Sequence, residues 1–208
     1  MPTASTPVPG DARRFAPAAA RNRGPILEVL RAVLPETGTV LEIASGTGEH
    51  AVAFAAELTG LRWIASDPDP ASRASIKAWI EATGIQTVCG PLDLDVTASD
   101  WDVEAPDAIV CINMIHIAPW SACEALMAGA GRLLGPGAPL CLYGPYKRGG
   151  VHTAPSNEAF DADLRSRDPA WGVRDLEAVA ELAARHGLKL ERVAEMPANN
   201  LTVVFRKG

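Results

Sequence analysis

The stretch from residue 40 to residue 56 constrains the fold of this chain more than any other. Residues 40–43 favour a β-strand, and Glu42 is their one polar member. Small residues follow as far as Gly48, and an alanine-rich helical pattern then begins. A strand that turns through glycines into a helix leaves unpaired backbone N–H groups and the positive end of the helix dipole at the turn. The sequence therefore predicts a strand–turn–helix unit that cradles an anionic or polar ligand.

Hydrophobic periodicity predicts alternating strands and helices along the rest of the chain. Helices are predicted at residues 25–34, 48–58, 71–83, 120–134 and 174–186, with a short helical piece at 157–165. Strands are predicted at residues 40–44, 61–66, 86–89, 107–112 and 139–143, and an antiparallel hairpin at 189–195 and 201–206. Strands that alternate with helices of about 10–15 residues indicate a parallel sheet with helices on both faces. The predicted fold class is therefore α/β.

The domain organisation follows from length and composition. Residues 1–14 are predicted to be a disordered tail, because Pro, Thr and Ser are frequent there and no apolar core of a secretory signal is present. Residues 15–208 are predicted to form one domain, since 208 residues suffice for one sizeable core and not for two. Residues 146–173 form a long loop-rich segment, which predicts a lid over the substrate.

Charge and cysteine usage narrow the class of partner. The net charge is −6 and the 19 Lys and Arg residues form no run, which argues against nucleic acid or an anionic membrane as the main partner. No apolar stretch approaches the roughly 20 residues that span a bilayer. The cysteines lack CxxC spacing and the histidines are scattered, so we predict no metal site and free thiols in a reducing cytoplasm. A small molecule is the expected partner, and both a monomer and a homodimer remain open.

The turn after the first strand carries two alternative interpretations. Gly46-Thr47-Gly48 followed by Ala51 matches GxGxxA, which is also found in nicotinamide enzymes. Glu42 extends the motif to E-x-x-x-G-x-G. A carboxylate at that position suits a cofactor with a free ammonium group better than one with a pyrophosphate. Alternatively, Glu42 pins the loop.

Carboxylates after the second and third strands are candidates for binding a nucleoside. Asp67 lies 19 residues after Gly48, close to the ~20-residue spacing at which a carboxylate accepts from ribose hydroxyls. Asp67 could instead cap the next helix, although Asp69 fits that role better. Asp93 or Asp95 could accept from an adenine amino group, with the Leu94 backbone beside the ring. The Asp-Val-Thr sequence favours Asp95, and either aspartate could instead cap the following turn.

Polar residues after the fourth and fifth strands should border a reacting centre, because ligands bind at the carboxyl ends of parallel strands. Asn113 can bond a cofactor, and His116, with an ordinary pKa of ~6.5, could accept a proton, line the substrate or simply pack. Tyr143-x-x-x-Lys147 matches a dehydrogenase motif that requires a helix. The intervening Gly144-Pro145 excludes a helix there, although Tyr146 could still contact substrate.

Several segments together resemble the class I S-adenosylmethionine-dependent methyltransferases, and more closely the DUF938 group that includes methyltransferase-like protein 26. The resemblance covers the chain from Phe15 onward. It rests on Phe15-Ala-Pro-Ala-Ala-Ala-Arg-Asn-Arg, Ala44-Ser-Gly-Thr-Gly-Glu-His, Ser66-Asp-Pro-Asp, Asn113-Met-Ile-His-Ile-Ala-Pro-Trp, Ser156-Asn-Glu-Ala-Phe-Asp, Arg167-Asp-Pro-Ala-Trp-Gly-Val-Arg-Asp and Met196-Pro-Ala-Asn-Asn-Leu.

The resemblance implies a Rossmann-like fold, with a mostly parallel seven-stranded sheet that ends in an antiparallel hairpin, and S-adenosyl-L-methionine as cofactor. It also implies cofactor contacts at Gly46, Gly48, Asp67, the Asp93 to Asp95 segment and Asn113. The full set of predicted cofactor-binding residues is Glu42, Ser45, Gly46, Gly48, Asp67, Asp93, Leu94, Asp95, Asn113 and Met114.

Substrate contacts are predicted outside the nucleotide half. The candidates are Asn22, Arg23, His116, Tyr146, Asn157, Trp171 and Arg174. A lid that combines arginines, an asparagine and a tryptophan suggests a small polar substrate, for which a carboxylate is one option. The alternative is a network of ion pairs that ties the lid to the first helix.

The predicted function is a methyltransferase that acts on a small polar molecule through an N, O or S acceptor, with His116 as candidate catalytic residue. The cofactor would carry the electrophile, so the protein mainly orients the reactants and excludes water. One alternative is a catalytically idle S-adenosylmethionine-binding interaction module. Another is a nicotinamide-dependent oxidoreductase, which would need a hydride-side acid that we do not find in the sequence.

Overall fold

The computed structural model describes residues 11–208. The part of the predicted tail at residues 1–10 lies outside the described residues. Residues 11–14 belong to the described chain, and there the Arg14 amide donates to Oγ of Ser75 at 2.8 Å.

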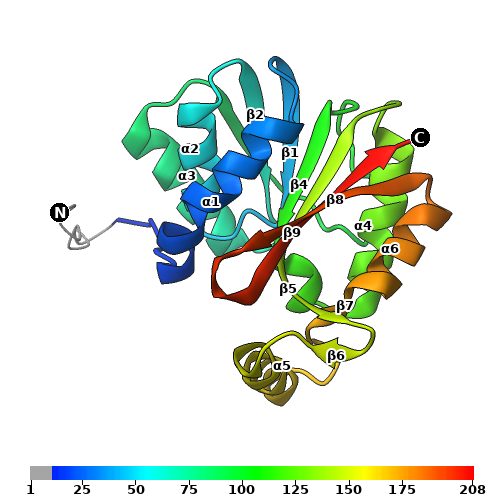
Figure 1. Ribbon diagram of the computed structural model, residues 1–208. Coiled ribbons are helices and arrows are strands. Elements are labelled where there is room, and N and C mark those ends of the chain that lie inside the picture. Colours follow the sequence, from blue (N-terminus) through cyan, green and yellow to red (C-terminus); the bar gives the residue numbers. More distant parts are fainter. Residues whose placement is uncertain (1–10) are drawn as a thin grey trace.

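The helices and strands alternate along the chain as the periodicity predicts (Figure 1). The helices are α1 (Pro17–Val33), α2 (Glu49–Glu57), α3 (Pro70–Thr83), α4 (Trp120–Leu133), α5 (Pro155–Arg167) and α6 (Leu176–Arg185), with short 3₁₀ turns η1 (Met114–His116) and η2 (Pro197–Asn199). The strands are β1 (Gly38–Ile43), β2 (Leu61–Ser66), β3 (Val88–Leu92), β4 (Ala108–Ile112), β5 (Pro139–Arg148), β6 (Val151–His152), β7 (Arg174–Asp175), β8 (Leu188–Met196) and β9 (Asn200–Lys207).

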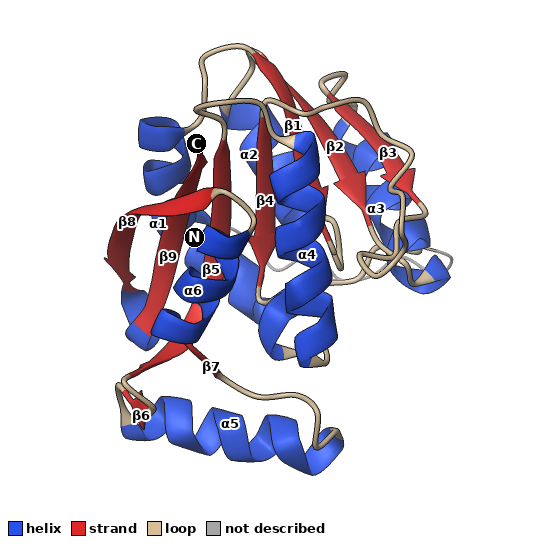
Figure 2. Cartoon of the chain, turned by 90° about the vertical axis from the view of Figure 1, so that its right-hand side faces the viewer, coloured by secondary structure: helices blue, strands red, loops and turns tan. Residues whose placement is uncertain are grey.

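The strands form one sheet in the order β3-β2-β1-β4-β5-β9-β8. Strands β1 to β5 are parallel, and β9 runs antiparallel between β5 and β8 (Figure 2). The short β6 and β7 pair with the end of β5. The predicted α/β class is confirmed, including the mostly parallel sheet and its antiparallel hairpin.

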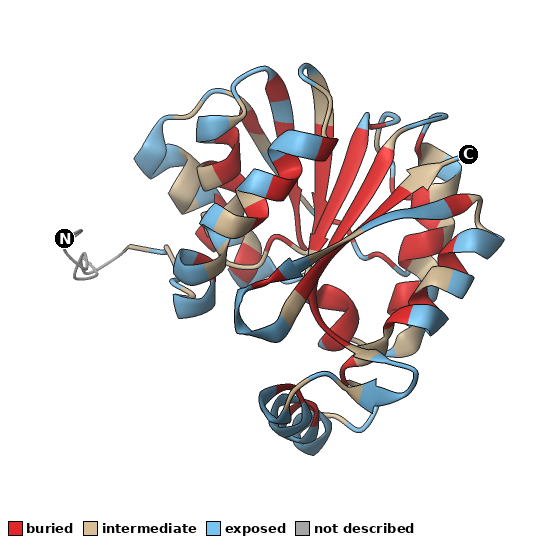
Figure 3. Ribbon diagram, viewed as in Figure 1, coloured by how far each residue is buried: buried red, intermediate tan, exposed pale blue. Residues whose placement is uncertain are grey.

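Helices cover both faces of this sheet, with α1, α2 and α3 on one face and α4 and α6 on the other (Figure 1). The side-chain alternation of the strands supplies both cores, since Val40 packs with α1 to α3 and its neighbour Leu41 packs with α4 and α6. Strand β4 is almost wholly buried, as its apolar run predicts (Figure 3). None of the helices within residues 11–208 combines the length and apolar character needed to cross a bilayer.

The first helix begins at Pro17, eight residues before the predicted start, and Pro25 lies inside it. An interior proline costs a helix roughly 3 kcal/mol, because it lacks an N–H and clashes with the preceding turn. The apolar side chains on this helix offset that cost, since Ile26 and Leu30 are fully buried against the sheet. Tertiary packing therefore decides that α1 continues through the proline.

Strand β5 continues to Arg148, five residues beyond the predicted end, because β6 and β7 supply pairing partners there. Tyr143 and Lys147 lie on this strand, which confirms that their spacing is no helical dehydrogenase motif. Residues 149–173 follow β5, and beyond the short β6 they carry α5 away from the two helical layers, at the lower end of the molecule in Figures 1 and 2. We call this segment the α5 excursion; it covers most of the predicted lid.

Candidate functional site

The loop between β1 and α2 contains two glycines with different tasks. A Cβ atom on Gly48 would lie 2.8 Å from Cα of Ile76, so glycine at this position lets α2 and α3 pack closely. Gly46 has φ +58°, and a Cβ there would meet no atom within 4 Å. One glycine thus serves packing, whereas the other leaves an open face at the positive end of α2.

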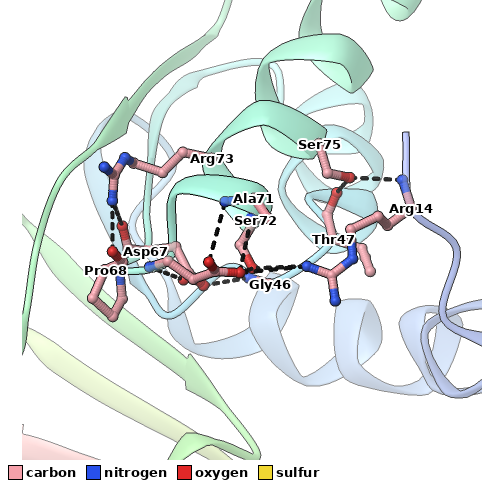
Figure 4. A network of polar contacts seen from close by, with 10 residues as sticks. Arg14, Gly46, Thr47, Asp67, Pro68, Ala71, Ser72, Arg73 and Ser75 are labelled. Atoms are coloured by element: carbon pink, nitrogen blue, oxygen red, sulfur yellow. Dashed lines mark hydrogen bonds and ion pairs between the residues drawn. The ribbon is translucent and has the colours of Figure 1, made fainter. Parts of the chain in front are cut away.

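Asp67 joins this loop to the end of β2 (Figure 4). Its Oδ2 accepts from the Gly46 amide at 2.9 Å, and its Oδ1 accepts from the Asp69 amide at 2.9 Å. Burial raises the pKa of Asp67 above its ordinary value, although these two hydrogen bonds act in the opposite direction. Asp69 itself accepts from the amides of Ala71 and Ser72, which confirms that Asp69 caps α3.

Glu42 lies beneath the loop and is buried. Its Oε2 accepts from the Trp63 indole N–H at 2.9 Å, and its backbone carbonyl accepts from Oγ of Ser66 at 2.6 Å. Burial raises the pKa of Glu42 from 4.5 to about 7. These contacts tie β1 to β2, and the Ser45 hydroxyl in the loop donates to the Glu42 carbonyl at 3.4 Å. Contact of the Glu42 carboxylate with a cofactor ammonium group stays a prediction. Ser45 is also buried, and its amide donates to Ser66 O at 2.8 Å.

The aspartates after β3 lie at the surface. Asp93 pairs with Arg73 at 2.9 Å, and the same guanidinium nitrogen donates to the carbonyl of Asp67. Asp95 accepts from the amide and hydroxyl of Thr97 at 2.8 and 2.7 Å, which is the turn-capping arrangement. Leu94 is buried in the core between them. An adenine contact in this segment stays a prediction.

Asn113 follows β4 directly and adopts φ +63°. Its amide donates to the carbonyl of Tyr143 in β5 at 2.8 Å, and Met114 after it is buried. The strand order changes direction between β1 and β4, so the loop with Gly46 and the turn at Asn113 flank the switch point where α/β sheets bind ligands.

A pocket of about 500 Å³ lies at the carboxyl ends of β4 and β5, and α1, α5 and the turn at η2 contribute to its walls. Its polar lining residues are Arg21, Asn22, Asn113, Tyr143, Ser156, Asn157 and Asn200. Its apolar lining residues are Ala18, Ile117, Pro145, Phe160, Pro197 and Ala198. A hollow of similar volume lies at the other end of the sheet, next to Val33 and Pro139, where the strands begin. Parallel sheets do not bind their ligands at that end.

Two of the predicted substrate residues, Asn22 and Asn157, line this pocket. Arg23, Trp171 and Arg174 do not belong to its lining in the described chain. Arg23 is exposed on α1. The guanidinium of Arg174 donates to the carbonyls of Ile115, Ala118 and Ala170, so it anchors the α5 excursion to the segment after β4.

Asp161, a residue of α5, forms the contacts that fix the α5 excursion in place. It accepts from Lys147 at 3.2 Å, from Arg165 at 3.1 Å and from the Val173 amide at 2.7 Å. An ion-pair network therefore exists, but its bonds tie the excursion to β5 and to itself, whereas the predicted network tied the lid to the first helix. In residues 11–208 there is no group of three or more His, Cys, Asp or Glu side chains that could hold a metal ion.

His116 and Tyr146 need a correction, because both side chains are fully buried and lie outside the pocket lining given by the described residues. Their rings pack edge to face at 5.1 Å. Burial lowers the pKa of His116 from 6.5 to about 3, and its Nδ1 accepts from the Arg174 amide at 3.3 Å. A Cβ on Gly144 would lie 2.5 Å from Nε2 of His116. This placement argues for a packing role and against a proton acceptor at the substrate.

Sequence reasoning missed Tyr143 and His50. Nε2 of His50 lies 2.8 Å from Oδ1 of Asn22, and the Asn22 side chain lies close enough to the Tyr143 phenol to act against the burial that raises its pKa. Tyr143 and Tyr146 lie three positions apart on β5, so they point to opposite faces of the sheet. The sequence did place both tyrosines at the end of a strand. It did not indicate which of the two lies on the face of the sheet that α1 covers.

Comparison of this chain with known proteins identifies one matching family and a set of solved structures with a similar fold. A family model described as "Protein of unknown function (DUF938)" matches residues 13–207. The chain is similar in structure to a putative O-methyltransferase from Nostoc punctiforme, with a TM-score of 0.81, 16% identity and coverage of 94% of this chain and 58% of that chain. It is also similar to the mitomycin 7-O-methyltransferase MmcR, with a TM-score of 0.79, 17% identity and coverage of 92% and 54%.

A third similar structure is CalO1, a methyltransferase in calicheamicin biosynthesis that was solved in its SAH-bound form. Its TM-score is 0.72 at 17% identity, with coverage of 92% of this chain and 54% of that chain. The chain thus spans a little more than half the length of these proteins. At such identities the likeness is one of fold.

Proposed function

This chain belongs to the DUF938 family, and from that premise we propose that it is an S-adenosylmethionine-dependent methyltransferase that acts on a small polar molecule. The observation that carries the proposal is the bond between the Gly46 amide and the Asp67 carboxylate at 2.9 Å. It joins a glycine turn and a strand-end carboxylate at the switch point of a methyltransferase-like sheet. The similarity in fold to methyltransferases, one of them solved with SAH bound, supports the same proposal.

The residues around the loop fit a nucleoside that carries an amino-acid group. Gly46 presents an open face to a ligand, and Asp67, an acceptor when ionised, suits two ribose hydroxyls. Glu42 contributes a buried carboxyl below the loop. S-adenosylmethionine, when bound, supplies an electrophilic methyl group on a positively charged sulfur. Asn113 lines the pocket and flanks the switch point, so it connects the cofactor half to the acceptor half.

The protein's contribution to catalysis is orientation and exclusion of water. The pocket lining, which comes entirely from described residues, holds no His, Lys, Asp or Glu that could exchange a proton near neutral pH. Its asparagines, Tyr143 and Ser156 can fix the acceptor by hydrogen bonds, and its apolar walls displace water. Alignment of the bound reactants alone removes a large part of the activation barrier to methyl transfer. The proposed reaction therefore needs no obligatory general base.

The decisive experiment has two steps. In the first step, calorimetry should detect binding of S-adenosylmethionine and of S-adenosylhomocysteine to the protein, with NADH as the comparison ligand. Absence of nucleoside binding at millimolar concentration would refute the proposal, and preferential NADH binding would favour an oxidoreductase. In the second step, a labelled methyl donor is incubated with a library of small polar molecules. Transfer of label supports an enzyme, whereas binding without any transfer favours an idle interaction module.

A further inference from the structure

The pocket at the carboxyl ends of β4 and β5 is lined by a cationic side chain, the exposed Arg21, although the whole chain is acidic. The sequence has 25 Asp and Glu against 19 Lys and Arg, giving a net charge of −6. Of the described residues that line the pocket, Arg21 is the only charged one. Phe160, Ile117 and Pro145 provide apolar walls beside it. A site with one unopposed cation and apolar walls selects a small anion with an apolar body.

A chain of three side chains sets the direction in which Tyr143 offers its proton. Burial lowers the pKa of His50 from 6.5 to about 4, so the ring is neutral at pH 7. A neutral ring has one N–H, and its 2.8 Å contact with Oδ1 of Asn22 places that N–H on Nε2. The Asn22 amide nitrogen is then left to face the Tyr143 oxygen, and the Asn22 side chain acts against the burial that raises the pKa of Tyr143, as a nearby donor does. The Tyr143 hydroxyl keeps its own proton for a partner in the pocket.

Arg21 and Tyr143 act on the same space. Burial raises the pKa of Tyr143, which keeps the phenol protonated at neutral pH, and the nearby Arg21 charge acts on that phenol in the opposite direction. Ser156, in the first turn of α5, lines the same pocket and adds a hydroxyl that can donate to a ligand there. The Arg21 cation and the Tyr143 hydroxyl therefore both favour a negatively charged hydrogen-bond acceptor on the ligand.

We propose that the pocket binds the methyl acceptor through a carboxylate, held by the Arg21 guanidinium and the Tyr143 hydroxyl, with an apolar body against Phe160 and Ile117. Asn22 and His50 are positioning residues that aim the Tyr143 proton. This inference rests on the proposed function, for which it names the substrate class as small carboxylic acids.

The test compares matched pairs of a carboxylate and its neutral amide. Benzoate with benzamide, phenylacetate with phenylacetamide, and indole-3-acetate with indole-3-acetamide are titrated by ligand-observed NMR into the protein, both alone and with S-adenosylhomocysteine in excess. We expect at least one carboxylate to bind about tenfold or more tightly than its amide, as a charge-assisted hydrogen bond provides. Arg21→Gln should abolish that preference, and Tyr143→Phe should reduce it several-fold.

Arg31→Gln is the matched control, because Arg31 is an exposed arginine on the same helix that pairs with Glu57 outside the pocket. It should keep the preference. Equal or absent binding of both members in every pair overturns the inference, as does equal loss in Arg31→Gln and Arg21→Gln. The S-adenosylhomocysteine affinity is measured separately in each protein. If the protein binds the nucleoside but shows no preference for carboxylates, this inference alone is refuted. If it prefers carboxylates but does not bind the nucleoside, the proposed function alone is refuted.

Discussion

The amide of Gly46 and Oδ2 of Asp67 lie 2.9 Å apart, and this contact makes the glycine loop and the end of β2 one unit. The second carboxylate oxygen accepts from the Asp69 amide at 2.9 Å. The group proposed to bind the sugar is therefore also the group that fixes the backbone around the ligand. Ligand binding and loop geometry should respond together when this carboxylate is changed.

Replacing Asp67 by Ala should lower the affinity for S-adenosylhomocysteine about a hundredfold or more. It removes the sugar contact and releases two backbone amides, and hydrogen bonds to a charged group contribute roughly 1.5–3 kcal/mol each. Calorimetry measures the affinity. The control is Asp69→Ala, which loses the cap of α3 and about 1 kcal/mol of unfolding free energy but keeps the affinity. If both variants bind equally well, Asp67 has no special role.

Glu42 should make the protein less stable as the pH rises from 4.5 to 7. Burial raises the pKa of Glu42 from 4.5 to about 7, so the folded state favours the neutral acid. The stabilisation is complete below pH 4.5 and is lost through pH 7. A shift of that size corresponds to about 3 kcal/mol.

Glu42→Gln keeps an acceptor for the Trp63 indole and cannot ionise. Urea unfolding at pH 5 and pH 8 should show the variant gaining about 2–3 kcal/mol relative to the wild type at the higher pH. An unchanged difference between the two proteins would mean that Glu42 ionises freely in the folded state.

His116 should contribute to the free energy of unfolding, and its titration should produce no inflection in the pH profile of the methyl-transfer rate. Burial lowers its pKa from 6.5 to about 3, so the folded state favours the neutral ring, and its contribution is complete above pH 6.5 and declines toward pH 3. His116→Ala should cost about 2–4 kcal/mol of unfolding free energy, because it leaves a cavity beside Tyr146. Nucleoside affinity should not change. A wild-type rate inflection near pH 6.5 that disappears in the variant would restore His116 as a catalytic base.

Asp161 should control the opening of the α5 excursion. Asp161→Asn weakens its contacts with Lys147 and Arg165, so amide hydrogen exchange across α5 should accelerate about tenfold or more in mass spectrometry. Asp163→Asn is the control, since this exposed carboxylate on the same helix pairs with Arg167 at the surface. Such a pair contributes about 1 kcal/mol at most, so exchange should change little. Equal acceleration in both variants would contradict the role of Asp161.

The elements with a strong local signal were predictable from the sequence. Strand β2 occupies residues 61–66 as predicted, and Asp69 caps α3 where the motif indicated. The errors lie where long-range contacts override local preference. Pro25 stays within α1 because buried neighbours hold the helix, and β5 extends to Arg148 because β6 and β7 pair with it.

The sequence by itself determined the α/β class and the strand–turn–helix unit at Gly46, because periodicity, glycine conformation and helix capping act between residues close in the chain. Only the tertiary structure decided the pocket, which brings together Arg21, Asn113, Tyr143, Ser156 and Pro197 from five separate segments. It also decided that Tyr143 faces α1 while Tyr146 joins His116 in the opposite core. Which face of a strand meets which helix depends on packing across the sheet, and that information is distributed over the whole chain.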